Sequence, residues 1–151
     1  ATGTIASVQP IHATSDRYMA DRLWGKRAEH AYVFKSLISS GARVTFGSDA
    51  PVETIDPLRG IYAAVTRKRE EEPSSSPWHP EQTISVEEAV RGYTAEPAYA
   101  GYREGVLGSL EPGKAADFSV LSRDIFAEDP AAILETRVLM NVVGGRTVFE
   151  S

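Results

Sequence analysis

The sequence predicts an α/β protein that starts with parallel strand–helix units and ends in a small set of antiparallel strands. Over residues 1 to about 69, short β-prone runs alternate with amphipathic helical stretches, which is the repeating unit of a parallel sheet or barrel. Residues 138–143 and 147–149 are β-prone and flank Gly144 and Gly145, an arrangement typical of a hairpin. The 42% hydrophobic content of the 151 residues is average for a globular protein with a buried core.

The first strand–helix unit lies near the N-terminus. Residues 5–9 are β-prone, and Pro10 is expected to end this strand. Ser15 and Asp16 offer N-cap oxygens to a helix around residues 17–23. The chain is therefore expected to pass from strand through loop to helix.

A second helix is predicted over residues 29–40, with Gly41 as its left-handed cap. Its apolar face consists of Val33, Phe34, Leu37 and Ile38. Residues 43–47 form the next β-prone run, and Asp56 with Pro57 marks the cap and first turn of a third helix. That helix shows amphipathic spacing suited to packing on a sheet.

The sequence pattern changes in the rest of the chain. Residues 70–83 contain three prolines and three serines and are expected to form a surface loop. Ser85 and Glu88 form a capping box for a further helix, and Pro97 opens a short helical piece. Residues 111–114 have the sequence of a type II turn, ahead of a β-prone run at 117–121.

Composition limits the partners. The net charge is −5, there are no cysteines, and no apolar run approaches the length of a membrane span. Nucleic acid and membrane are therefore not expected as partners, and a metal would be held by His, Asp or Glu. No signal-peptide pattern is seen at the N-terminus, so the sequence predicts a soluble, cytoplasmic protein.

Asp49 is the leading candidate for chemistry, because it follows a predicted strand and precedes a helix. Functional side chains gather at the carboxyl ends of parallel strands, where a carboxylate can bind a metal or accept a proton from water. His12 holds the same place one unit earlier, and Glu53 is a weaker candidate. The structural alternatives are that Asp49 organises its turn and that His12 bonds to backbone. His30 and His79 are expected to be structural or solvated.

Three strings suggest a family. SVQPIH at residues 7–12, GSDAPVE at 47–53 and GSLEPGKAADFSVL at 108–121 occur in this order. Together they resemble the C-terminal half of amidohydrolase-superfamily enzymes of the YtcJ-like group, amidohydrolase family 3. The resemblance covers nearly the whole chain and implies a metal-dependent (β/α)₈ TIM-type barrel with a β-sandwich beside it. It also implies hydrolysis of amide or other C–N bonds in small molecules.

The resemblance assigns residues to roles and regions. Asp49 matches the family's Asp after the eighth strand, a metal ligand, general base or both, and Gln9 and His12 match a string implied to line the substrate pocket. Residues 1–104 would be the C-terminal part of the barrel, and residues 105–151 the C-terminal strands of the sandwich. The divalent metal of the full-length enzyme is expected to be zinc.

Several family motifs have no counterpart here: the HxH motif, the mid-barrel Lys or carboxylate, and two later histidines. The chain is therefore expected to be the C-terminal segment of a longer enzyme, inactive and with little or no metal alone. A complete barrel needs about 250 residues, so exposed strand edges predict a homo-oligomer or association with the absent N-terminal part. Two alternatives remain: a non-catalytic oligomerising or binding module, and an unrelated site formed by His12, His30 and Asp49.

Overall fold

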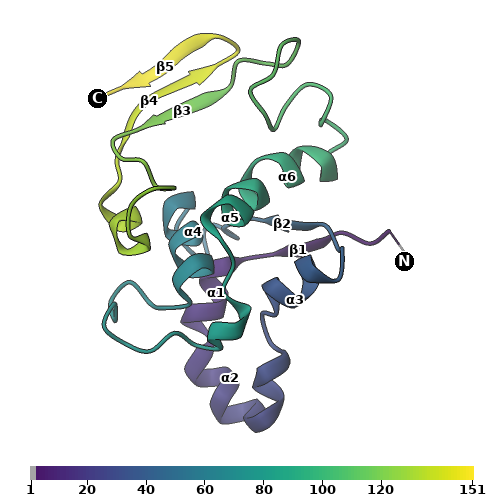
Figure 1. Cartoon of the computed structure of the whole chain (residues 1–151), viewed down its shortest axis with the longest axis vertical. Coiled ribbons are helices and arrows are strands. Elements are labelled where there is room, and N and C mark those ends of the chain that lie inside the picture. The colour runs from purple at the N-terminus through teal and green to yellow at the C-terminus, as the bar shows by residue number, and fades with distance from the viewer. Residues whose placement is uncertain (1–2) are drawn as a thin grey trace.

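The computed structural model describes residues 3–151 and contains a short parallel sheet and an antiparallel sheet (Figure 1). In the parallel sheet, β1 (Ala6–Val8) pairs with β2 (Val44–Phe46), and Val8 lies opposite Phe46. The predicted parallel strand–helix unit is thus confirmed. The α-helices are α1 (Pro10–Ser15), α2 (Arg17–Trp24), α3 (Phe34–Ser39), α4 (Pro57–Thr66), α5 (Val86–Tyr93) and α6 (Ala95–Ala100).

The expected loop after the first strand is wrong, because α1 begins directly at Pro10. Proline fixes φ near the helical value and lacks the N–H that a first-turn residue leaves unpaired, so it starts a helix as readily as it ends a strand. The side chain of Asp16 does not cap α2. It accepts a hydrogen bond of 2.5 Å from the Tyr32 hydroxyl instead. Burial, together with this bond, raises the pKa of Tyr32.

The single helix predicted over residues 29–40 is also wrong. A 3₁₀ helix, η1 (Gly25–His30), precedes α3, and Tyr32 between them has a φ of 53°. The Tyr32 carbonyl accepts a hydrogen bond of 3.0 Å from Arg67 Nη1, and its ring packs edge-on against Phe34. These tertiary contacts override the local helical pattern. The left-handed Gly41 after α3 is confirmed, with φ of 80°.

The core lies between β1–β2 and the helices around them (Figure 1). Two predicted helix caps are confirmed. Asp56 caps α4 by accepting a hydrogen bond from Leu58 N at 2.9 Å, and Ser85 with Glu88 forms a capping box on α5. Apart from the 3₁₀ helix η2 (Pro80–Gln82), residues 70–83 form the expected loop. This loop is not wholly at the surface, because Trp78 is buried in the core.

The C-terminal tail forms an antiparallel sheet in the order β3 (Phe118–Leu121), β4 (Val138–Val143) and β5 (Arg146–Glu150). The predicted hairpin is confirmed, with positive φ at the two glycines between β4 and β5. The 3₁₀ helix η3 (Pro130–Glu135) contributes Ile133 to the same core as α4. The boundary expected at residues 104 and 105 stays a prediction. Over residues 3–151, no helix has both the length and the apolarity needed to cross a membrane.

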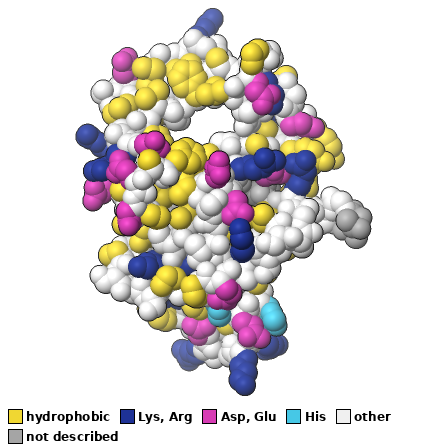
Figure 2. Space-filling view, viewed as in Figure 1, with side chains coloured by type: hydrophobic (Ala, Val, Ile, Leu, Met, Phe, Trp, Pro, Cys, Tyr) yellow, Lys and Arg dark blue, Asp and Glu magenta, His cyan; other side chains and the backbone are white. Residues whose placement is uncertain are grey.

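An apolar hollow separates the tail sheet from α4 and α5. Its volume is about 880 Å³, and its lining includes Leu58, Tyr93, Phe118, Val142 and Val148. Figure 2 shows hydrophobic side chains gathered around this opening. All residues of β5 are exposed, so the described chain leaves both faces of this edge strand uncovered.

Candidate functional site: a histidine and an aspartate at one sheet edge

The side chains of His12 and Asp49 approach each other at the carboxyl edge of the parallel sheet. His12 lies in α1, which follows β1 almost directly, and Asp49 lies in the loop after β2. Because adjacent parallel strands end at the same edge, the two side chains meet although they are far apart in sequence. The distance from His12 Nε2 to Asp49 Oδ2 is 3.8 Å.

This contact is an approach of a ring nitrogen to a carboxylate oxygen and not a hydrogen bond, since 3.8 Å exceeds hydrogen-bonding distance. The His12 side chain is 19% exposed and that of Asp49 is 52% exposed. Within residues 3–151, His12 Nε2 is buried without a hydrogen-bond partner. A buried nitrogen without a partner is costly. His12 Nε2 therefore has a hydrogen-bonding capacity that the described residues leave unused.

The Asp49 backbone organises its turn while its carboxylate stays available. Asp49 has a φ of 58°, a left-handed conformation that Asp tolerates better than most residues. Its carbonyl oxygen accepts a hydrogen bond of 2.8 Å from Val52 N. The turn-forming role weighed from the sequence thus belongs to the main chain, and the side chain points toward His12.

Gln9 and Glu53 are placed differently from this pair. Gln9 is half-buried just before α1, and its carbonyl accepts a hydrogen bond from His12 N at 3.2 Å. No hydrogen bond joins the Gln9 side chain to Asp49 or His12 in the described chain. Glu53 Oε1 accepts a hydrogen bond of 2.8 Å from Ser15 Oγ. Sequence reasoning missed Ser15 as a site neighbour; its signal is the i, i+3 spacing from His12 on one helix face.

The other histidines lie elsewhere. The His30 side chain is 79% exposed, 3.5 Å from Glu29. The His79 ring packs against Trp78 with ring centroids 4.4 Å apart, and it lies 3.4 Å from Glu81. The alternative site of His12, His30 and Asp49 is not formed.

Residues 3–151 do not form a complete metal centre. Among residues 3–151, no three His, Cys, Asp or Glu side chains converge well enough to hold a metal ion. A catalytic zinc needs about three protein ligands, whereas His12 and Asp49 supply at most two. The described residues by themselves therefore do not fit a complete metal site.

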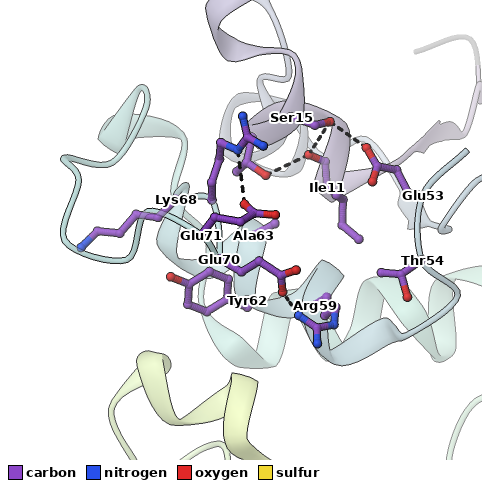
Figure 3. Close-up of a pocket in the computed structure, with 12 residues that line it drawn as sticks. Ile11, Ser15, Glu53, Thr54, Arg59, Tyr62, Ala63, Lys68, Glu70 and Glu71 are labelled. Atoms are coloured by element: carbon purple, nitrogen blue, oxygen red, sulfur yellow. Dashed lines mark hydrogen bonds and ion pairs between the residues drawn. The ribbon is translucent and has the colours of Figure 1, made fainter.

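A small polar cavity lies between α1, α4 and the segment after α4 (Figure 3), and neither His12 nor Asp49 lines it. Its volume is about 210 Å³. Figure 3 shows Ser15 and Glu53 pointing toward each other on one wall, and Arg59 paired with Glu70 on another. Because cationic and anionic side chains pair within it, the cavity has no strong preference for one sign of charge.

The chain has relatives with named chemistry. Residues 1–149 match the model of a family described as the amidohydrolase family. The chain is 39% identical over 144 residues to a putative amidohydrolase, YtcJ, of Bacillus subtilis, covering 95% of this chain and 27% of that protein. It is 34% identical over 131 residues to an N-substituted formamide deformylase of Arthrobacter pascens, covering 85% of this chain and 24% of that protein.

A solved structure is also similar to this chain. An uncharacterised metal-dependent hydrolase of Pyrococcus horikoshii superposes with a TM-score of 0.62 at 27% identity, covering 85% of this chain and 25% of that one. The chain thus spans about a quarter of the length of these relatives. With the family model matching nearly every residue, the chain belongs to the amidohydrolase family.

Proposed function

We propose that this chain supplies Asp49 and His12 to the active site of a longer, metal-dependent hydrolase that cleaves amide or other C–N bonds in small molecules. The observation that carries the proposal is the 3.8 Å approach of these side chains at the carboxyl edge of two parallel strands. Membership of the amidohydrolase family supports it, as does the similarity to a protein named a formamide deformylase.

In this proposal Asp49, His12 and Gln9 have different tasks. Asp49 accepts a proton from the attacking water and delivers it to the leaving nitrogen. His12, whose Nε2 has no partner in the described chain, hydrogen-bonds the substrate or the water, and Gln9 contributes to the substrate pocket. Asp49 would be one ligand of a divalent metal, which we propose to be zinc, and the longer polypeptide would hold the other ligands. Such a metal would supply polarisation of the scissile carbonyl.

We further propose that β1 and β2 are the last two strands of a TIM-type barrel. Residues 1–104 would then complete the barrel, and residues 105–151 would complete a β-sandwich. The parallel pairing of β1 with β2 and the antiparallel tail sheet support this assignment. Association with the rest of the enzyme, or with a second copy, and a cytoplasmic location remain predictions.

The second candidate is a non-catalytic module that folds by association. The absence of a third metal-binding side chain near His12 and Asp49 among residues 3–151 favours it. The two candidates differ in one respect, because only the first makes Asp49 a metal ligand, so that a metal drawn to Asp49 would also affect His12, 3.8 Å away.

Zinc titration of the chain, followed by imidazole NMR, tests the proposed function. The chain has three histidines, and each lies within 4.0 Å of a carboxylate: His12 with Asp49, His30 with Glu29, and His79 with Glu81. Two histidines therefore serve as internal controls. We expect zinc to shift the His12 signals first and Asp49→Asn to abolish that preference, while Glu29→Gln leaves it intact. Equal responses of all three histidines would contradict the proposal.

A further inference from the structure

The loop that carries Asp49, residues 47–55, has little apolar packing to hold it. Val52 and Ile55 are 70% and 78% exposed. Within residues 3–151, the polar side-chain contacts from this loop to another element are Asp49 with His12 and Glu53 with Ser15. Both contacts reach α1, so the position of the loop depends on that helix.

Only one of these contacts is a hydrogen bond. Ser15 Oγ and Glu53 Oε1 are 2.8 Å apart, a normal length for a hydroxyl donating to a carboxylate. Ser15 Oγ also lies 3.2 Å from the Ile11 carbonyl oxygen. A hydroxyl has one proton to donate, and the charge-assisted bond to the carboxylate is the stronger of the two. The 3.8 Å approach of His12 and Asp49 cannot fix the loop in this way.

The spacing links the two contacts mechanically. His12 and Ser15 are three residues apart on one face of α1. Asp49 and Glu53 are four residues apart in the loop, with the Val52 N to Asp49 O hydrogen bond closing the turn between them. A shift of Glu53 away from Ser15 would therefore also move Asp49 relative to His12.

We propose that Glu53 is a positioning residue: by accepting the Ser15 hydrogen bond it holds the loop against α1 and sets the spacing of Asp49 and His12. The purpose of that spacing rests on the proposed function, whereas the contact itself does not. Glu53 is half-buried beside the polar cavity and lies outside the apolar core. Its loss should therefore loosen the loop without unfolding the chain.

Amide hydrogen exchange at Val52 in the 151-residue chain tests the contact. Loss of one hydrogen bond by Glu53→Ala should speed exchange by roughly five- to tenfold. Glu53→Gln keeps an acceptor oxygen and should restore the slower rate. Ser15→Ala should match Glu53→Ala, and the double variant should add nothing, as expected for two residues that share one bond.

Glu71→Ala is the matched control, because Glu71 borders the same cavity but lies outside the loop. It should leave Val52 exchange unchanged. Equal exchange rates in Glu53→Ala and Glu71→Ala, at an unchanged thermal midpoint, would overturn the proposal. Faster exchange in Glu53→Ala alone, reversed in Glu53→Gln, would support it.

The zinc response of His12 separates this inference from the proposed function. If both hold, Glu53→Ala weakens the His12 shift and Glu53→Gln restores it. If Asp49→Asn keeps wild-type turnover in the longer hydrolase while Val52 exchange follows the expected pattern, the positioning contact stands and the proposed function fails. If zinc shifts His12 equally in wild type and Glu53→Ala with Val52 exchange unchanged, the positioning role is overturned.

Discussion

Arg67 Nε donates a hydrogen bond of 2.9 Å to the carbonyl oxygen of Trp78, although the Arg67 side chain is completely buried. A second guanidinium nitrogen, Nη1, donates to the Tyr32 carbonyl at 3.0 Å. Burial lowers the pKa of Arg67 to about 10, although the charge of Glu81 opposes the shift. This arginine therefore joins the end of α4 to two segments that local sequence patterns do not bring together.

Arg67→Lys should destabilise the chain by about 2–4 kcal/mol, because one ammonium group cannot replace two hydrogen bonds in this geometry and would leave a buried carbonyl unpaired. Urea unfolding monitored by tryptophan fluorescence measures the loss. Arg22→Lys, at an exposed position of α2, is the control and should change stability little. A loss below about 0.5 kcal/mol for Arg67→Lys would show that the two bonds do not hold these segments.

Glu96 should make stability depend on acid pH. Burial alone would raise its pKa, but the hydrogen bonds and charges of Arg91 and Arg43 outweigh burial and hold the pKa below 4.5. The folded pKa is thus lower than the unfolded one. The stabilisation is present above the unfolded pKa and is lost as pH falls through the folded value.

Replacing Glu96 by Gln should therefore flatten the stability curve below about pH 5. At neutral pH it should cost roughly 2 kcal/mol, a buried-pair value reduced because the arginine partners are partly exposed. Thermal unfolding from pH 3 to 7 measures both effects, with the exposed Glu87→Gln as control. An equal acid slope in wild type and Glu96→Gln would contradict this account.

The uncovered tail sheet predicts self-association. The hollow of about 880 Å³ is lined mainly by apolar side chains, and Val148 and Phe149 of β5 are 63% and 47% exposed. Exposed apolar area of this kind favours association. Sedimentation velocity should show a dimer or larger species, and Val148→Lys should shift the distribution toward monomer. A monodisperse wild-type monomer would contradict the expectation.

Local signals predicted most of the elements but not the contacts between them. The Ser85–Glu88 capping box, the cap at Asp56 and the glycine turn of the tail depend on neighbouring residues, so the sequence reveals them. The sequence did not predict the start of α1, because a proline can either end a strand or begin a helix. The break at Tyr32 was missed because its cause, Arg67, is 35 residues away.

In the candidate site, too, one contact was predictable from the sequence and another was not. Strand order brought His12 and Asp49 to one edge, so their approach followed from topology. Ser15 and Glu53 are 38 residues apart, and no sequence periodicity predicts the hydrogen bond between them. The approach of these two side chains was thus predictable, whereas the Ser15–Glu53 contact depends on the tertiary structure.

The most direct test of the central claim is the turnover of Asp49→Asn in the longer hydrolase that we propose this chain to be part of, assayed with a small-molecule amide that the wild-type enzyme hydrolyses. The account predicts a fall in kcat of roughly 10²–10⁴, as expected for loss of a general base, and no change in Glu29→Gln, which alters an exposed carboxylate beside His30. Turnover of Asp49→Asn close to that of the wild type would contradict it.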